Sequence, residues 1–206
     1  MATIWNGLRN AIYGIIVALA VAAPAAAFDF DNVAFIQTVD GPTGIPVGHA
    51  EFCASHAAEC QPNRVVVDAV PLNEAMWSQL LAVNSAVNGA VIPVSDRDLY
   101  GVDEFWTYPN GYGDCEDFVL AKRRELINAG WPASVLLMSV VRQPNGEGHA
   151  VLLVRTDHGD LVLDNQDGAV RVWNETPYYY LKRQSQADAG KWVDMVDDRQ
   201  ITVAAR

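Results

Sequence analysis

The chain has 206 residues and a formal net charge of −11 at pH 7, with 25 acidic and 14 basic side chains. No basic patch stands out along it, which argues against nucleic acid as the main partner. A chain of this length suits a domain with a sizeable core. No internal repeat, low-complexity run or long linker divides it.

Residues 1–27 follow the order of a secretory signal. A single charged residue, Arg9, precedes an apolar stretch, and Pro24 and three alanines come next. This order predicts cleavage after Ala27. The apolar stretch is short against the roughly 20 residues of a membrane span, which disfavours an uncleaved anchor. We therefore expect a signal peptide at 1–27 and one domain at 28–206, exported to the periplasm with a charge of −12 once Arg9 is lost.

The three cysteines divide into a pair and a remainder. Cys53 and Cys60 lie close in sequence, and in an oxidising compartment we expect them to form a disulfide. The alternatives are two unpaired buried thiols, or a metal site with His49 or His56. The metal site is the weaker because no second Cys/His pair has ligand spacing. Cys115 is left without a partner, as an accident or as a reactive thiol.

The first half of the chain indicates helices. Residues 28–50 look irregular, with glycines and prolines as turn punctuation. Asn73 is a candidate N-cap, and the apolar spacing after it predicts a helix that Gly89 and the following proline end. The segment 94–112 is polar, aromatic and glycine-bearing, which is typical of a loop. A second helix is predicted from about residue 114 to 129.

After the second helix the apolar period changes to that of strands. Valine- and leucine-rich runs predict strands at 134–142, 150–155, 161–164 and 169–173, with a late strand near Tyr178–Tyr180. Helices first and then an antiparallel sheet indicate an α+β domain.

Three residue types in this order suit nucleophilic catalysis. Cys115 begins a predicted helix, where unpaired backbone N–H groups and the helix dipole favour a thiolate. His149 could act as its base, and Asp164 could orient the imidazole. Each residue also has a plain interpretation: an inert buried thiol, a satisfied polar group and a turn residue.

The register of two strands tests this arrangement. A turn centred between Thr156 and Asp157 puts His149 directly opposite Asp164, close enough for the pair to meet. A turn centred on His158–Gly159 would put Asp164 opposite Leu153 instead.

Three motifs together resemble the bacterial transglutaminase-like cysteine proteinases, which include the LapG-type periplasmic proteases. They are Gly113-Asp114-Cys115-Glu116-Asp117, Gly148-His149-Ala150-Val151-Leu152 and Leu163-Asp164-Asn165. The resemblance extends from about Cys53 to Trp192. It implies a papain-like, transglutaminase-type fold with N-terminal helices packed on an antiparallel sheet. It also implies that Cys115, His149 and Asp164 are catalytic.

The resemblance further implies calcium close to the nucleophile, with Asp114 and Glu116 as the matching acids. Charge gives a separate reason, since carboxylates crowded beside Cys115 raise the pKa of its thiol. A calcium ion would neutralise them, and carboxylate oxygens are its preferred ligands. The alternative is that these acids only cap the helix.

The leading hypothesis is a periplasmic thiol endopeptidase. The resemblance implies a protein substrate, namely a large surface adhesin cut to release cells from a biofilm. It also implies a membrane receptor, responsive to cyclic-di-GMP, that sequesters the protease. One alternative is transglutaminase-type acyl transfer to an amine. Another is a non-catalytic exported binding module, which a wide separation of Cys115 and His149 would favour.

Overall fold

The computed structural model describes Met1 and residues 31–199. The predicted signal peptide beyond Met1, its cleavage site and the first residues of the predicted domain lie outside the described residues. Within the described part, no helix combines the length and the apolar character that a membrane crossing requires.

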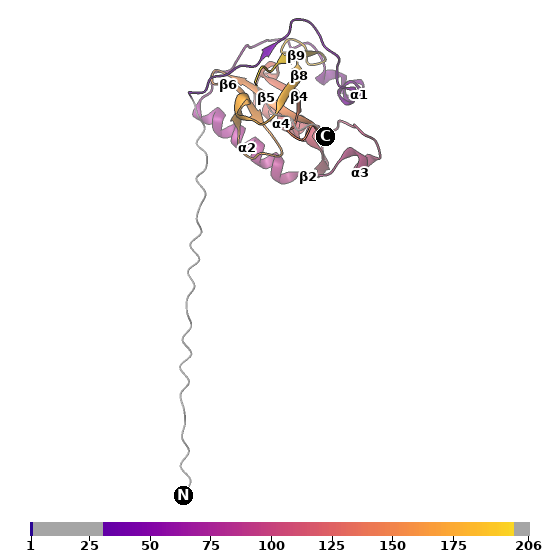
Figure 1. The fold of residues 1–206 in the computed structure, drawn as a ribbon, viewed down its shortest axis with the longest axis vertical. Coiled ribbons are helices and arrows are strands. Elements are labelled where there is room, and N and C mark those ends of the chain that lie inside the picture. Colours follow the sequence, from indigo (N-terminus) through magenta and orange to yellow (C-terminus); the bar gives the residue numbers. More distant parts are fainter. Residues whose placement is uncertain (2–30, 200–206) are drawn as a thin grey trace.

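Helices precede most of the strands along the chain (Figure 1). The helices are α1 (Val47–Ser55), α2 (Glu74–Ala90), α3 (Asp96–Tyr100) and α4 (Cys115–Asn128), with 3₁₀ turns at Ala57–Glu59, Ala133–Val135 and Trp173–Glu175. The strands are β1 (Gln37–Thr38), β2 (Ile92–Pro93), β3 (Tyr112–Gly113), β4 (Leu136–Arg142), β5 (Gly148–Thr156), β6 (Gly159–Leu163), β7 (Arg171–Val172), β8 (Tyr179–Gln184) and β9 (Trp192–Val196).

Seven of the strands form one antiparallel sheet in the order β1-β9-β8-β4-β5-β6-β7. The strands β2 and β3 make a separate parallel pair just before α4. Helix α4 packs on β5 and β4, and α2 packs on α4. In Figure 1, α1 and α2 lie on opposite sides of the molecule, with the sheet between them. The predicted α+β class is confirmed.

Both predicted helices form because each buries an apolar face, and α2 is also capped at its start. The side chain of Asn73 caps α2 by accepting from Met76 N at 2.9 Å, and Leu80 and Val87 are buried. Helix α4 buries Leu120 and Leu126 completely or nearly so. Because α4 is packed against other elements on both of its faces, its first residue is held in a fixed position.

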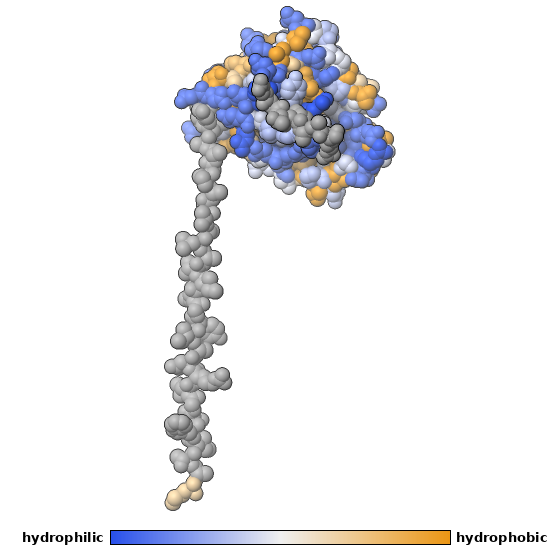
Figure 2. Space-filling model, viewed as in Figure 1, coloured by the Kyte–Doolittle hydropathy of each residue, from blue (hydrophilic) through white to orange (hydrophobic). Residues whose placement is uncertain are grey.

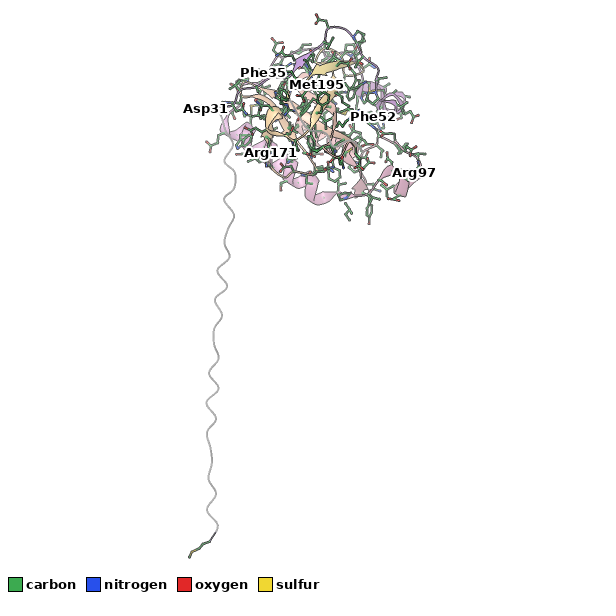
Figure 3. The ribbon with its side chains drawn as sticks, viewed as in Figure 1. Asp31, Phe35, Phe52, Arg97, Arg171 and Met195 are labelled. Carbon is green, nitrogen blue, oxygen red and sulfur yellow. A yellow bond between two sulfur atoms is a disulfide. The ribbon has the colours of Figure 1, made fainter. Side chains whose placement is uncertain are left out.

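The structure adds elements that the sequence pattern did not indicate. Helix α1 lies partly in the segment taken as irregular, and its N-cap, Pro46, makes no side-chain cap bond. Helix α3, in the predicted loop, has five residues and is capped by Ser95. In Figure 3, Phe52 of α1 and Arg97 of α3 lie on one side of the molecule, and Arg171 of β7 lies on the other. The face drawn in Figure 2 mixes polar and apolar residues without one large apolar patch.

The predicted disulfide between Cys53 and Cys60 forms in the structure, and Cys115 is the free cysteine of the described chain. Closing this seven-residue separation restricts the unfolded chain. Replacing both cysteines by serine should lower the free energy of unfolding by about 2–3 kcal/mol. Urea unfolding without reductant measures this loss. Cys115→Ser is the control, since it removes a thiol and keeps the crosslink. Equal stability of the double variant and the control would refute the prediction.

Candidate active site

Helix α4 begins with Cys115, whose side chain is partly exposed. Its thiol donates a hydrogen bond to Glu116 Oε2 at 3.2 Å. Burial raises the pKa of the Cys115 thiol well above its ordinary value, and the Glu116 carboxylate raises it further. A hydrogen bond from the backbone N–H of Ala150, on β5, opposes both effects. The thiol therefore favours its protonated form in this arrangement.

His149 and Asp164 form a buried pair. His149 Nε2 lies 2.8 Å from Asp164 Oδ1, and both side chains are almost fully enclosed. Because the carboxylate accepts, Nε2 carries the proton and Nδ1 is the acceptor in the neutral ring. The side-chain amide of Gln166 lies 3.4 Å from Nδ1. This ring nitrogen is the one left to receive a proton from a substrate or a nucleophile.

Neither of the two registers considered from the sequence is the observed one. Thr156 pairs with Gly159 and Leu152 with Leu163, so the turn is centred between Asp157 and His158. Continued by one pair, this register sets Asp164 opposite Val151 rather than His149. A shift of two residues keeps side chains on the same face, and diagonal neighbours remain within reach of each other. The imidazole therefore meets the carboxylate diagonally.

Three groups around Asp164 were missed from the sequence. The hydroxyl of Tyr178 donates to Asp164 Oδ2, and its ring centre lies 5.3 Å from that of His149. Gln166 N donates to Oδ1 at 3.0 Å, and the Asn88 side chain donates to the backbone carbonyl of Asp164 at 2.8 Å. Burial alone would raise the pKa of Asp164, but the hydrogen bonds from His149, Gln166 and Tyr178 lower it below its ordinary value. The aspartate stays ionised and fixed.

Cys115 and His149 line the same cleft, which has a volume of about 460 Å³. Trp106, buried in the core, forms part of the wall. Among the described residues no hydrogen bond joins the thiol to the imidazole, because the thiol points at Glu116. Catalytic contacts are often loose before substrate binds. The shared cleft does not fit the wide separation that would favour a binding module.

An acidic cluster stands beside the thiol. Asp96, Asp114 and Glu116 each offer a carboxylate oxygen within 4.8 Å of the other two. Asp114 occupies the N-cap position but makes no side-chain cap bond, and instead accepts from Asp96 N at 3.1 Å. The Oδ1 atoms of Asp96 and Asp114 are buried without a hydrogen-bond partner. Burial and the neighbouring Asp114 raise the pKa of Glu116 to about 9.

Asp117 adds a fourth carboxylate behind this cluster. Its Oδ1 accepts from Thr107 N at 2.9 Å, and its side chain lies where any Cβ at Gly113 would stand. Burial raises its pKa to about 7. Sequence reasoning found Asp114 and Glu116 and missed Asp96, which lies 18 residues before Asp114 and carried no motif.

The alternative metal site at the first two cysteines does not fit the structure. His49, Cys53 and Cys60 lie close together, but the disulfide occupies both sulfur atoms. His49 Nδ1 accepts from Trp192 Nε1 at 3.0 Å, and burial lowers the pKa of His49 to about 4. This histidine is a neutral, hydrogen-bonded core residue.

The sequence profile of the bacterial transglutaminase-like cysteine proteinases matches residues 39–200. The chain belongs to this family. Among curated proteins, no sequence matches it significantly. The resemblance stated from three motifs is thus confirmed.

Solved structures of Legionella pneumophila LapG are similar to this proteinase. A calcium-bound structure has 25% identity and a TM-score of 0.47, covering 52% of this chain and 64% of that one. An EGTA-treated structure has 23% identity and a TM-score of 0.49, covering 60% and 69%. A third has 25% identity and a TM-score of 0.49, covering 57% and 68%. In the first comparison the chain therefore spans less than two thirds of LapG.

Replacing Tyr178 by phenylalanine should raise the pKa of Asp164 toward its ordinary value, since one donor to the carboxylate is lost. A lowered folded-state pKa stabilises the fold above the unfolded pKa, and this stability is lost as pH falls through the folded pKa. The variant should therefore lose roughly 1–3 kcal/mol at pH 7 and less at pH 2.

Carboxyl NMR titration and urea unfolding at the two pH values measure both effects. Tyr180→Phe is the control, because the Tyr180 hydroxyl bonds Thr176 Oγ1 at 2.9 Å and not Asp164. An unchanged Asp164 pKa in Tyr178→Phe would contradict the assignment.

Proposed function

We propose that this proteinase is a periplasmic thiol endopeptidase with Cys115 as nucleophile, His149 as base and Asp164 as orienting group. This proposal rests mainly on one observation. Asp164 is hydrogen-bonded to His149 Nε2, which leaves Nδ1 available in the cleft that also contains the thiol. The position of Cys115 at the first residue of α4 supports an anionic sulfur during reaction.

The chemistry follows from these positions. The Cys115 thiol breaks its hydrogen bond with Glu116 and passes its proton to His149 Nδ1. The sulfur then attacks the peptide carbonyl. The backbone N–H of Cys115 faces the developing oxyanion as one donor of an oxyanion hole. The imidazolium then gives its proton to the leaving amine. Water, deprotonated by the same imidazole, hydrolyses the thioester and restores the thiol.

The acidic cluster suits calcium because it contains buried carboxylate oxygens that have no hydrogen-bond partner. Asp96, Asp114 and Glu116 would hold the ion, and backbone or water oxygens would fill the rest of a shell of about 6–8 ligands. A bound Ca²⁺ would offset the negative charge that disfavours a thiolate. Glu116 is the residue shared by the cluster and the thiol, so its carboxylate links the two.

Family membership supports a protein substrate. A large surface adhesin as that substrate, with a membrane receptor that sequesters the protease, is the proposal that follows from the LapG resemblance. Export to the periplasm rests on the signal-like order of residues 1–27. The same thioester could pass to an amine instead of water, so the products decide between hydrolysis and acyl transfer.

Cys115→Ala and His149→Ala should each reduce cleavage of a proteome-derived peptide library roughly a thousandfold or more, because the two residues act as one unit. Mass spectrometry of new peptide termini measures the cleavage. His158→Ala, on the turn between β5 and β6, is the matched control and should keep activity. Isopeptide cross-links in place of new termini would show acyl transfer. A wild-type protein that yields neither product would refute the enzymatic proposal.

Saturating Ca²⁺ should raise the melting temperature, since an ion that binds only the folded state at about 100 times its dissociation constant adds about 2.7 kcal/mol. For a domain of this size that is a shift of roughly 5–10 °C. Asp96→Asn should abolish most of the shift, and Asp103→Asn, an exposed carboxylate outside the cluster, should keep it. Calorimetric melting with calcium and with chelator measures this. Equal shifts in both variants would remove Asp96 from the site.

A further inference from the structure

A buried arginine on α4 has no carboxylate in ion-pair contact. Arg123 is 5% exposed, and its Nε donates to Leu136 O at 3.1 Å. Its two terminal nitrogens make no hydrogen bond to the described residues, and the nearby Glu59 carboxylate attracts its charge without forming an ion pair with it. A guanidinium keeps its charge in proteins, so enclosing it unpaired is costly.

Two less enclosed arginines in the described chain have a carboxylate partner, whereas Arg183, which is 4% exposed, has none in ion-pair contact. Arg155 pairs with Asp160 at 3.1 Å, and Arg199 pairs with Asp197 at 2.7 Å. Both of these arginines are more exposed than Arg123. Arg123 and Arg183, the most enclosed of these arginines, both lack an ion-paired carboxylate, and Arg123 is the one that lines the cavity described next.

Arg123 lines a cavity of about 610 Å³ beside the 3₁₀ turn that follows α1. Arg64 and Arg124 line it as well, and the guanidinium of Arg124 is held 3.8 Å from the centre of the Tyr108 ring. Glu59 is the carboxylate in the wall, and it already accepts from the Tyr108 hydroxyl. Three positive groups face one negative group, in a chain whose net charge is −11.

We propose that this cavity binds an oxyanion, a carboxylate or phosphate group, with Arg123 as its anchor and Arg124 and Arg64 at its mouth. Guanidinium forks match the two oxygens of such groups. The volume lies within the range of about 300–1,000 Å³ that holds small ligands. Arg123 follows Cys115 by eight residues, or about 12 Å along the helix. The site is distinct from the catalytic cleft and independent of the proposed endopeptidase activity.

Isothermal titration of the full-length protein at constant ionic strength tests the site with three probes: inorganic phosphate, succinate and a blocked Ala-Glu-Glu-Ala peptide. Saturable one-to-one binding of at least one probe is expected. Arg123→Lys keeps the charge and loses the fork, and should weaken that binding about tenfold or more. Arg142→Ser, which alters an exposed arginine at the end of β4, is the control and should leave affinity unchanged.

The three probes separate the sources of the oxyanion. Binding of phosphate alone indicates a phosphorylated ligand, and binding of succinate or the peptide indicates a carboxylate ligand. If Arg123→Lys fails to fold, Arg64→Ser and Arg124→Ser at the mouth replace it, each with an expected loss of affinity. Absence of saturable binding to folded wild-type protein, or equal affinity in the cavity variants and Arg142→Ser, would overturn the proposal.

Discussion

The burial of α4 between α2 and the central strands is the constraint on which the site depends. Because β5 packs along this helix, the first residue of α4 meets the first residues of β5. That contact places the Cys115 sulfur against the backbone N–H of Ala150 and in one cleft with His149. The proposed nucleophile and base therefore come together through packing between regular elements, not through a flexible loop.

The same burial creates an electrostatic conflict at the start of α4. A helix N-terminus stabilises about one nearby negative charge. Here Asp114 and Glu116 flank the thiol directly, and Asp96 joins them from α3. Protonation of Glu116 relieves part of this conflict, because burial and repulsion raise its pKa to about 9. The proposed calcium ion would offset the same negative charge without protonation of Glu116.

Much of this site could be predicted from the sequence because its motifs lie at element ends. Cys115 opens a helix whose apolar spacing is clear, and His149 and Asp164 border recognisable strands. The register could not be predicted, because a two-residue turn at Asp157–His158 has no glycine or asparagine to mark it. Asp96 was missed because a five-residue helix has too few turns for an apolar period. Tyr178 was missed because a hydrogen bond to Asp164 leaves no trace in the pattern.

Charge along α4 shows how one helix can carry two different sites. Acids gather at its first turn and basic side chains, Lys122 to Arg124, in its second half, as the helix dipole favours. The charge of each group is larger than the helix dipole can offset. The acids near Cys115 hold unpartnered oxygens, and Arg123 holds an unpaired guanidinium. The proposed calcium site and the proposed oxyanion site would each supply the charge opposite to these groups.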